Sequence, residues 1–331
     1  YHQAAEQNCR LWCDSRNGSA DVFDQAVIDL AKKTGHPELA NVPWCLWGHS
    51  GGGFWASLMQ MSHAKKIVAI WFQSGTAHSR WVSGEIDAPE ITDAAMQIPM
   101  MANPGFKERG HERHKVAYNG CYEMVKDYNR RGAPIAFAPD PLTGHETGDS
   151  RYLSIPFFDA CLAMRLPDKA GDSKLKPVNM GQGDTRQLLE NYMGLDHPSF
   201  HENKRRIDLN WFPNKEIAVM WDEFVKVGSV SDTTRPPAPF DVQVTGNRVT
   251  WTARADFESG IQAFVILRDG EEIGRLPSES KKRWGRPLFQ NMSFHDTPEA
   301  PLPKMQFIDK QATGKHNYSV MTINSAGLQS E

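Results

Sequence analysis

Residues 43–55 read PWCLWGHSGGGFW and carry the strongest structural signal in the chain. The apolar run 43–47 predicts a strand, and the helical pattern that starts at Phe54 predicts a helix directly after it. Between them, Gly48-His49-Ser50-Gly51-Gly52 fits the pattern G-x-S-x-G, in which a serine sits on a sharp turn from strand to helix. Such a turn strains the serine backbone and requires small residues two places before and after it, as here. The stretch therefore predicts a nucleophilic serine, and the alternative is a glycine-rich turn with an inert one.

Strand-like and helical stretches alternate on both sides of this turn. Alternation of this kind predicts a parallel sheet with flanking helices, the α/β class. The expected helices cover residues 22–33, 54–63 and 116–131, and the expected strands cover residues 43–47, 67–72, 97–102 and 134–138.

A proline-rich stretch, SVSDTTRPPAP at residues 229–239, marks a domain boundary because its three prolines favour an extended, unpaired linker. Residues 1–228 form the predicted α/β domain, and residues 240–331 form a second one. There, short alternating segments and the turn sequences Gly246-Asn247 and Asp269-Gly270 predict an all-β module with hairpins. Its expected strands are residues 240–245, 248–252, 261–268, 272–276 and 317–323.

The composition places limits on function. The chain has 331 residues, 40% hydrophobic and 23% charged, which is an ordinary globular mixture. No apolar run approaches the roughly 18 residues of a membrane helix, so we expect no membrane span. The net charge of −3 lacks the basic excess that nucleic-acid binding requires. Five cysteines form no CxxC pair, so buried thiols are the commoner interpretation and a disulfide is an alternative in a secreted protein.

A serine nucleophile needs a base and an acid, in the chain order nucleophile, acid, base. Glu108 leaves the end of the strand expected near residues 98–103, and His145 lies in the loop after the strand 134–138. Both loops emerge at the same edge of a parallel sheet, so we expect Glu108 to be the acid and His145 the base. Asp140 is the second choice as acid, although its proline neighbours favour a turn role.

These residues resemble the α/β-hydrolase fold, and specifically its serine-esterase branch, over residues 1–227. In that family the acid commonly lies three residues after a glycine, and the spacing from Gly105 to Glu108 is the same. The resemblance implies an oxyanion hole formed by the backbone N–H of Gly51 and by a second donor that cannot be placed. It also implies early strands that the 49 residues before Ser50 do not provide, so we expect a missing N-terminal segment or another fragment to complete the sheet.

Residues 236–331 resemble a fibronectin type III domain. The resemblance rests on the proline-rich lead-in, on Trp251 in the second strand, and on Tyr318, which fits the tyrosine corner of such sandwiches. The family pattern implies a last strand beyond residue 331 and makes residues 277–304 a long insertion. In bacterial enzymes such modules accompany secreted hydrolases of polymers, which favours an extracellular or periplasmic location.

Several other features receive simpler interpretations. His111 and His114 are spaced for a metal but lack a third ligand, so no metal and no cofactor are expected. His49 and Trp81 are candidates for the substrate pocket, with ordinary packing as the alternative. The polar segment 166–214 is too long for a simple connection and is expected to wrap the surface or overhang the site.

The sequence therefore predicts a serine carboxylic-ester hydrolase that uses Ser50, His145 and Glu108 and forms an acyl-enzyme. Esters of a polysaccharide or other polymer are the expected substrates. The alternatives are a serine peptidase of the same fold and a non-catalytic adhesion protein in which Ser50 is inert.

Overall fold

The computed structural model describes residues 12–169, 174–187, 210–256, 258–278 and 304–331. The chain divides into two compact units, Tyr1–Ser229 and Val230–Glu331, and each is considered by itself. No helix within the described residues is long and apolar enough to cross a membrane.

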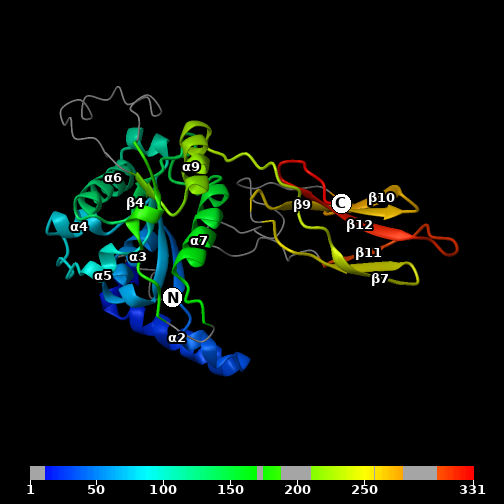
Figure 1. The fold of residues 1–331 in the computed structure, drawn as a ribbon, viewed down its shortest axis with the longest axis horizontal. Coiled ribbons are helices and arrows are strands. Elements are labelled where there is room, and N and C mark those ends of the chain that lie inside the picture. Colours follow the sequence, from blue (N-terminus) through cyan, green and yellow to red (C-terminus); the bar gives the residue numbers. More distant parts are fainter. Residues whose placement is uncertain (1–11, 170–173, 188–209, 257, 279–303) are drawn as a thin grey trace. The chain divides into compact units, whose positions relative to one another are not determined.

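A four-stranded parallel sheet forms the centre of the first unit (Figure 1). Its order is β1-β2-β3-β4, so each strand pairs with its neighbour in the chain. β2 lies inside the sheet, and all seven of its residues are buried, which explains its nearly uninterrupted apolar sequence. The strands are β1 (Trp44–His49), β2 (Ile67–Gln73), β3 (Met100–Asn103) and β4 (Ile135–Phe137).

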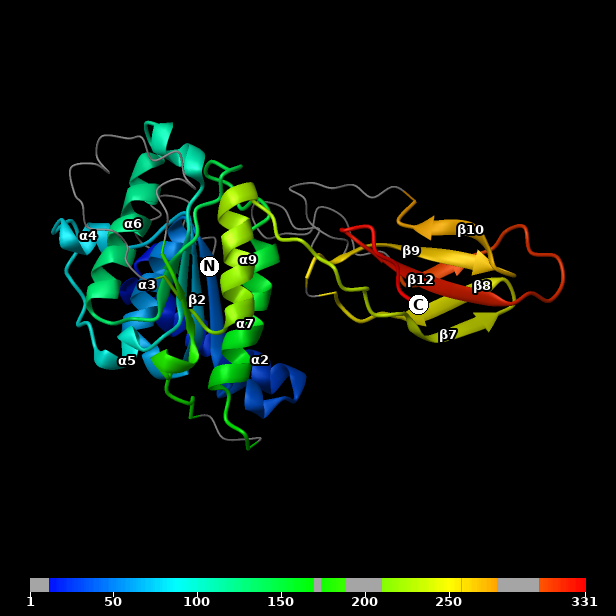
Figure 2. The same ribbon diagram turned by 45° about the horizontal axis from the view of Figure 1, so that its top comes forward.

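Helices cover both faces of this sheet (Figures 1 and 2). Because right-handed crossovers between successive neighbours place their helices on the same side, α3 (Gly51–Ser62) and α6 (Lys115–Arg130) lie together with the short α4 (His78–Val82) and α5 (Asp93–Met96). The opposite face carries α7 (Arg151–Arg165) and α9 (Lys215–Val227). The predicted parallel sheet with flanking helices is confirmed.

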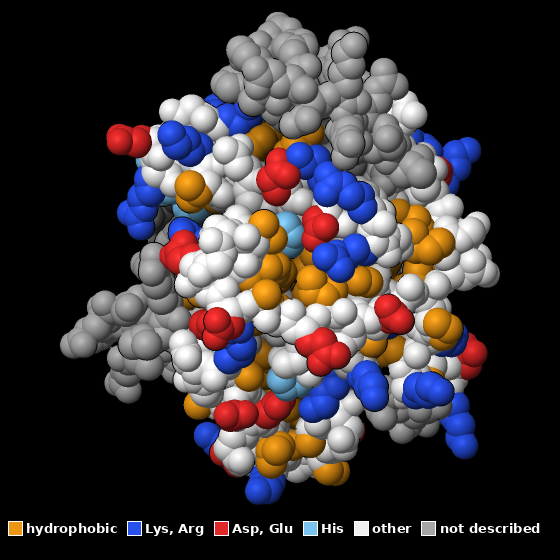
Figure 3. All heavy atoms as spheres, turned by 90° about the vertical axis from the view of Figure 1, so that its left-hand side faces the viewer, with side chains coloured by type: hydrophobic (Ala, Val, Ile, Leu, Met, Phe, Trp, Pro, Cys, Tyr) orange, Lys and Arg blue, Asp and Glu red, His pale blue; other side chains and the backbone are white. Residues whose placement is uncertain are grey.

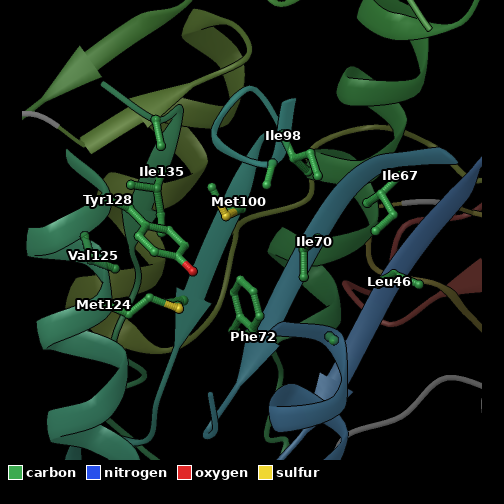
Figure 4. Close-up of a cluster of buried hydrophobic side chains, with 14 of the residues drawn as sticks. Leu46, Ile67, Ile70, Phe72, Ile98, Met100, Met124, Val125, Tyr128 and Ile135 are labelled. Atoms are coloured by element: carbon green, nitrogen blue, oxygen red, sulfur yellow. The ribbon is translucent and has the colours of Figure 1, made fainter. Parts of the chain in front are cut away.

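The main core lies between α6 and the sheet (Figure 4). Met124, Val125 and Tyr128 of α6 recur at helical spacing and pack toward Phe72 and Met100 of the sheet, and all five are fully buried. Burying side chains of this kind stabilises the fold by about 1.5–3 kcal/mol each. The 3.6-residue periodicity of α6 therefore places these side chains on the face of the helix that packs against the sheet.

Shorter elements complete the first unit. α2 (Ser19–Thr34) precedes β1, and it begins three residues before the expected start at residue 22, with Gly18 as its N-cap. The region predicted to lack regular structure, 166–214, contains a buried strand that pairs with another short strand; its residues 170–173 and 188–209 lie outside the described residues. The remaining elements are β5 (Asp184–Arg186), β6 (Asn210–Phe212), η1 (Ser15–Asn17), η2 (Pro37–Ala40), η3 (Ala64–Lys66), η4 (Phe106–Gly110) and η5 (Met180–Gln182).

Buried amide side chains connect the carboxyl ends of the strands. The Gln73 side chain donates to the Asn103 carbonyl, and the Asn103 side chain donates to the Ala138 carbonyl. The Asn210 side-chain oxygen accepts from the Phe137 N–H. Because a buried polar group is costly unless it is paired, these bonds hold the strand ends in one relative position.

Charged groups of both signs are mixed on the face of the first unit that carries α4, α5 and α6 (Figure 3). Small apolar areas lie between them, and no broad field of one sign is visible on this face. Of the cysteines, Cys121 and Cys161 are buried thiols and Cys45 is an exposed one, whereas Cys9 lies outside the described residues.

The second unit contains two antiparallel three-stranded sheets, with orders β11-β8-β7 and β10-β9-β12. Their core includes Trp251, Phe264 and Ile266. Gly246 and Gly270 have positive φ angles of 62° and 89°, which the two hairpin turns require. The predicted all-β character is confirmed. The strands are β7 (Phe240–Thr245), β8 (Arg248–Thr252), β9 (Ile261–Arg268), β10 (Glu271–Leu276), β11 (Gln306–Ile308) and β12 (Tyr318–Asn324).

Tyr318 is expected to fit a tyrosine corner, but its hydroxyl bonds to a side chain. Its hydroxyl donates to Asp309 Oδ2 at 2.9 Å, and Arg268 binds the same oxygen at 2.9 Å. The tyrosine corner of the family pattern would instead bond the backbone. Most of the expected insertion at residues 277–304 lies outside the described residues.

Candidate active site

Ser50 lies on the turn between β1 and α3, in a backbone conformation that a serine rarely adopts. Its φ and ψ angles are 55° and −113°, and its N–H donates to the Gln73 carbonyl at 2.8 Å. A positive φ in a residue with a side chain costs about 1–3 kcal/mol, so surrounding structure must hold it in place. The turn presents the hydroxyl at the carboxyl edge of the sheet.

Three glycines allow the chain to pass closely around this turn. A Cβ atom on Gly48 would lie 2.3 Å from the Gly52 carbonyl oxygen, and one on Gly53 would lie 2.2 Å from the Gly75 carbonyl oxygen. A Cβ on Gly75 would lie 2.2 Å from the Ser50 carbonyl oxygen. By contrast, a Cβ on Gly52 would meet nothing within 4 Å. The expected need for a small residue at Gly52 is therefore wrong, and it applies instead to Gly53 and Gly75, which the motif does not include.

Replacing Gly75 with alanine is expected to displace Ser50 and to lower the free energy of unfolding by about 1–3 kcal/mol, because the added methyl group overlaps backbone atoms. Gly52→Ala is the matched control. Its new methyl group has open space in the first turn of a helix, so stability should stay within about 0.5 kcal/mol or rise. Urea unfolding of the two variants measures the difference, and equal midpoints would contradict this account of the turn.

Glu108 lies in η4, just beyond the end of β3, and its side chain is completely buried. Its Oε1 lies 2.6 Å from His145 Nδ1. Burial raises the pKa of the Glu108 carboxyl, while the hydrogen bond and charge of His145 and the nearby hydroxyl of Ser74 act in the opposite direction. The site therefore contains a buried acid that is held beside one nitrogen of the imidazole.

His145 lies in the loop after β4, and its Nε2 is 2.9 Å from Ser50 Oγ. The acid and base loops are bonded to each other: the N–H groups of Phe106 and Lys107 donate to the carbonyls of Asp140 and Thr143. This approach is so close that a Cβ on Gly105 would lie 1.9 Å from the Gly144 carbonyl oxygen. Contacts between loops that are 34 or more residues apart in the chain therefore set the position of His145.

The three predicted residues thus form a continuous chain of side chains. A carboxylate that accepts from Nδ1–H leaves Nε2 as the acceptor for the serine O–H. In this arrangement the imidazole can remove the hydroxyl proton as the oxygen attacks a carbonyl group. The chemistry that it supports is nucleophilic acyl transfer.

Of the other three candidates, His49 and Gly51 lie at the site and Trp81 does not. The His49 ring lies 4.9 Å from the His145 ring, so His49 belongs to the site. Gly51 is the first residue of α3, so its N–H lies at the positive end of the helix dipole. Trp81 is buried in a separate cluster with Leu58 and makes an edge contact with His78, so the structure does not bring it to Ser50.

Trp12 is a neighbour of the turn that the sequence interpretation missed. Its indole ring lies 3.1 Å from the position that a Cβ atom on Gly51 would occupy. No local pattern marks this residue, because the contact joins segments about 40 positions apart. Trp12 therefore lies against the start of α3, beside the turn that carries Ser50.

Asp140, the second choice as acid, supports the base loop and is not bonded to His145. Its Oδ1 accepts from the Leu142 N–H at 2.8 Å, and its side chain is buried. Burial raises the pKa of Asp140 from 3.8 to about 6, and the charges of Asp149 and Glu146 act in the same direction. Asp140 therefore stabilises a turn of the loop that carries His145.

Asp140 should make the stability of the first unit depend on pH. Because its pKa is higher in the folded state, the folded protein binds the proton more tightly, and stability falls as the pH rises from about 4 through about 6. The loss is at most about 3 kcal/mol at neutral pH. Asp140→Asn keeps an acceptor for Leu142 and should be about 1–3 kcal/mol more stable than wild type at pH 7, with little difference at pH 4. Urea unfolding at both pH values measures this; a wild type that gains stability over that interval relative to the variant would contradict it.

His111 and His114 do not form a metal site with a third residue. Among the described residues, no group of three or more histidine, cysteine, aspartate or glutamate side chains is arranged to hold a metal ion. Their rings are instead stacked on each other, with centroids 4.2 Å apart.

The first unit is thus an α/β structure in which a serine, a histidine and a glutamate meet at the carboxyl edge of a parallel sheet. Comparison of the chain with protein-family models, with curated proteins and with solved structures finds no match. The function is therefore inferred from the geometry of the site.

Proposed function

We propose that this protein is a serine carboxylic-ester hydrolase whose first unit has the α/β-hydrolase fold. The observation that carries the proposal is the link from Ser50 Oγ to His145 Nε2 at 2.9 Å and from His145 Nδ1 to Glu108 Oε1 at 2.6 Å. The positive φ of Ser50 supports it further, because backbone strain of this kind concentrates at functional sites.

In the proposed acylation step, Ser50 Oγ attacks the ester carbonyl while His145 Nε2 takes the hydroxyl proton. Glu108 holds the imidazole in the required tautomer and stabilises the imidazolium that forms. The Gly51 N–H at the start of α3 donates to the oxygen that becomes negative. His145 then gives the proton to the leaving alcohol, and the carbon–oxygen bond of the ester breaks.

Deacylation repeats these roles with water. His145 takes a proton from the water molecule as its oxygen attacks the acyl-enzyme, and it returns that proton to Ser50 Oγ as the acid product leaves. The balance is one water consumed, with one carboxylic acid and one alcohol released.

Esters of a polysaccharide or of another polymer are the proposed substrates, and the proposed location is extracellular or periplasmic. The support is the second unit, whose two antiparallel sheets are consistent with a fibronectin type III module of the kind that accompanies secreted polymer hydrolases. A peptidase of the same fold would use the same three residues, whereas an adhesion protein would need none of them.

Labelling with a fluorophosphonate tests the proposal. Intact mass should show one adduct on the wild-type chain and none on Ser50→Ala, because only an activated serine attacks this reagent at a useful rate. An unlabelled wild type would contradict the proposal and favour adhesion. Labelling together with cleavage of peptides, but not of acetyl or aromatic esters, would favour the peptidase.

A further inference from the structure

A column of three imidazole rings ends on the proposed base. The His114 ring stacks on the His145 ring with centroids 4.0 Å apart and planes inclined by 29°. On the other side, His111 stacks on His114 at 4.2 Å and 11°. Because Glu108 and Ser50 occupy the two nitrogens of His145, the ring offers other groups mainly its faces, and His114 covers one of them.

The outer ring of the column is held by the backbone. His111 Nδ1 accepts from the N–H groups of Arg113 and His114, both at 3.2 Å. A nitrogen that accepts carries no proton, so these bonds specify the tautomer of His111. His111 therefore provides a fixed, flat surface behind His114.

The surroundings of the middle ring favour its neutral form. Burial lowers the pKa of His114, and so do the positive charge of Arg113 and any proton charge on His145 or His111, against the opposing charge of Glu146. His114 is also the N-cap of α6, where the helix dipole disfavours a cation. A neutral ring can remain stacked on His145 when His145 becomes an imidazolium, whereas a second cation 4 Å away would oppose that charge.

The His114 side chain does not cap the helix that it precedes. It forms no hydrogen bond that caps α6, and it is only half-buried. Its ring stacks on the rings of His111 and His145. The helix start would therefore tolerate another aromatic residue at this position.

We infer that His114 is a positioning residue for His145: the flat ring of His114 holds the His145 imidazole in the plane that joins Glu108 to Ser50. This inference rests on the proposed function. His145 needs such support because it lies in an irregular loop between β4 and α7, where no helix or strand fixes its χ angles. A small misplacement of a reacting group costs much of its rate, so a ring packed on one face contributes to turnover without contacting substrate.

Inactivation kinetics with a fluorophosphonate test the inference, with p-nitrophenyl acetate as a second probe. His114→Ala should lower the maximal inactivation rate and kcat by about 10–100-fold, while the inhibitor constant and KM change less than about two-fold. His114→Phe restores a flat uncharged ring and should recover to within about three-fold of wild type. His111→Ala, which leaves the inner stack in place, is the control and should have the smaller effect.

The outcomes separate this inference from the proposed function. A wild type that takes no label overturns both. If the wild type is labelled and His114→Ala is inactivated at the same rate, only the positioning role is overturned. The positioning role is also overturned if His114→Ala has a raised KM and an unchanged kcat. A His114→Phe variant as slow as His114→Ala, with a urea midpoint equal to that of wild type, also overturns it, because stacking would then not be the contact that matters.

Discussion

Ester turnover by the Ser50→Ala variant is expected to be about 10⁴–10⁶-fold lower than by wild type. The alanine removes the atom that forms the acyl-enzyme and leaves His145 Nε2, now 2.9 Å from the former hydroxyl position, without its proton donor. The surrounding hydrogen-bond donors would still bind the ester and would account for the small residual rate. A loss of this size is what removal of an essential nucleophile produces.

The fold of the Ser50→Ala variant should be unaffected. The positive φ at this position strains alanine about as much as serine, and the backbone bond from residue 50 to the Gln73 carbonyl remains. Ser83→Ala is the control, since that exposed hydroxyl donates only to the Arg80 carbonyl and should be dispensable. Initial rates with p-nitrophenyl acetate measure both variants. More than about 1% residual turnover in Ser50→Ala would be incompatible with an acyl-enzyme at this residue.

Glu108→Gln is expected to lower turnover by about 10³–10⁴-fold. The amide has the same shape as the carboxyl and keeps the side chain inside η4, but it can present an N–H to His145 Nδ1 and so stabilise the wrong tautomer. It also removes the negative charge that favours the imidazolium. Values of kcat/KM with p-nitrophenyl acetate measure the loss.

Glu146→Gln provides the matched comparison for Glu108→Gln. Glu146 lies next to His145 in the chain, yet its Oε1 accepts from the Gly144 N–H and not from the imidazole. It should reduce turnover by less than about ten-fold, because the geometry of the Glu108 pair is untouched. Rate profiles from pH 5 to 9 would distinguish the two variants. If Glu108→Gln and Glu146→Gln lowered turnover by the same factor, the two carboxylates would act by stabilising the loop, and Glu108 would not control the tautomer of His145.

Local patterns predicted most secondary structure in the described residues. The apolar run before Ser50 and the 3.6-residue period of α6 specify their elements through neighbours in the chain, and both elements form as expected. Boundaries shifted by a few residues, as at α2, which begins at Ser19 after the N-cap Gly18 and not at residue 22. In 166–214, short strands formed where polar composition had indicated irregular structure, because pairing between β5 and β6 outweighs weak local preference.

The sequence by itself determined which loops would meet, since the carboxyl ends of neighbouring parallel strands share one edge of a sheet. Ser50, Glu108 and His145 could be proposed on that ground alone. Only the tertiary structure decided which other residues join them: Trp81 packs elsewhere, whereas Trp12, Gly75 and His114 lie against the site. Contacts such as the 4.0 Å stack of His114 on His145 depend on the packing of segments far apart in the chain, and no local pattern of residues encodes them.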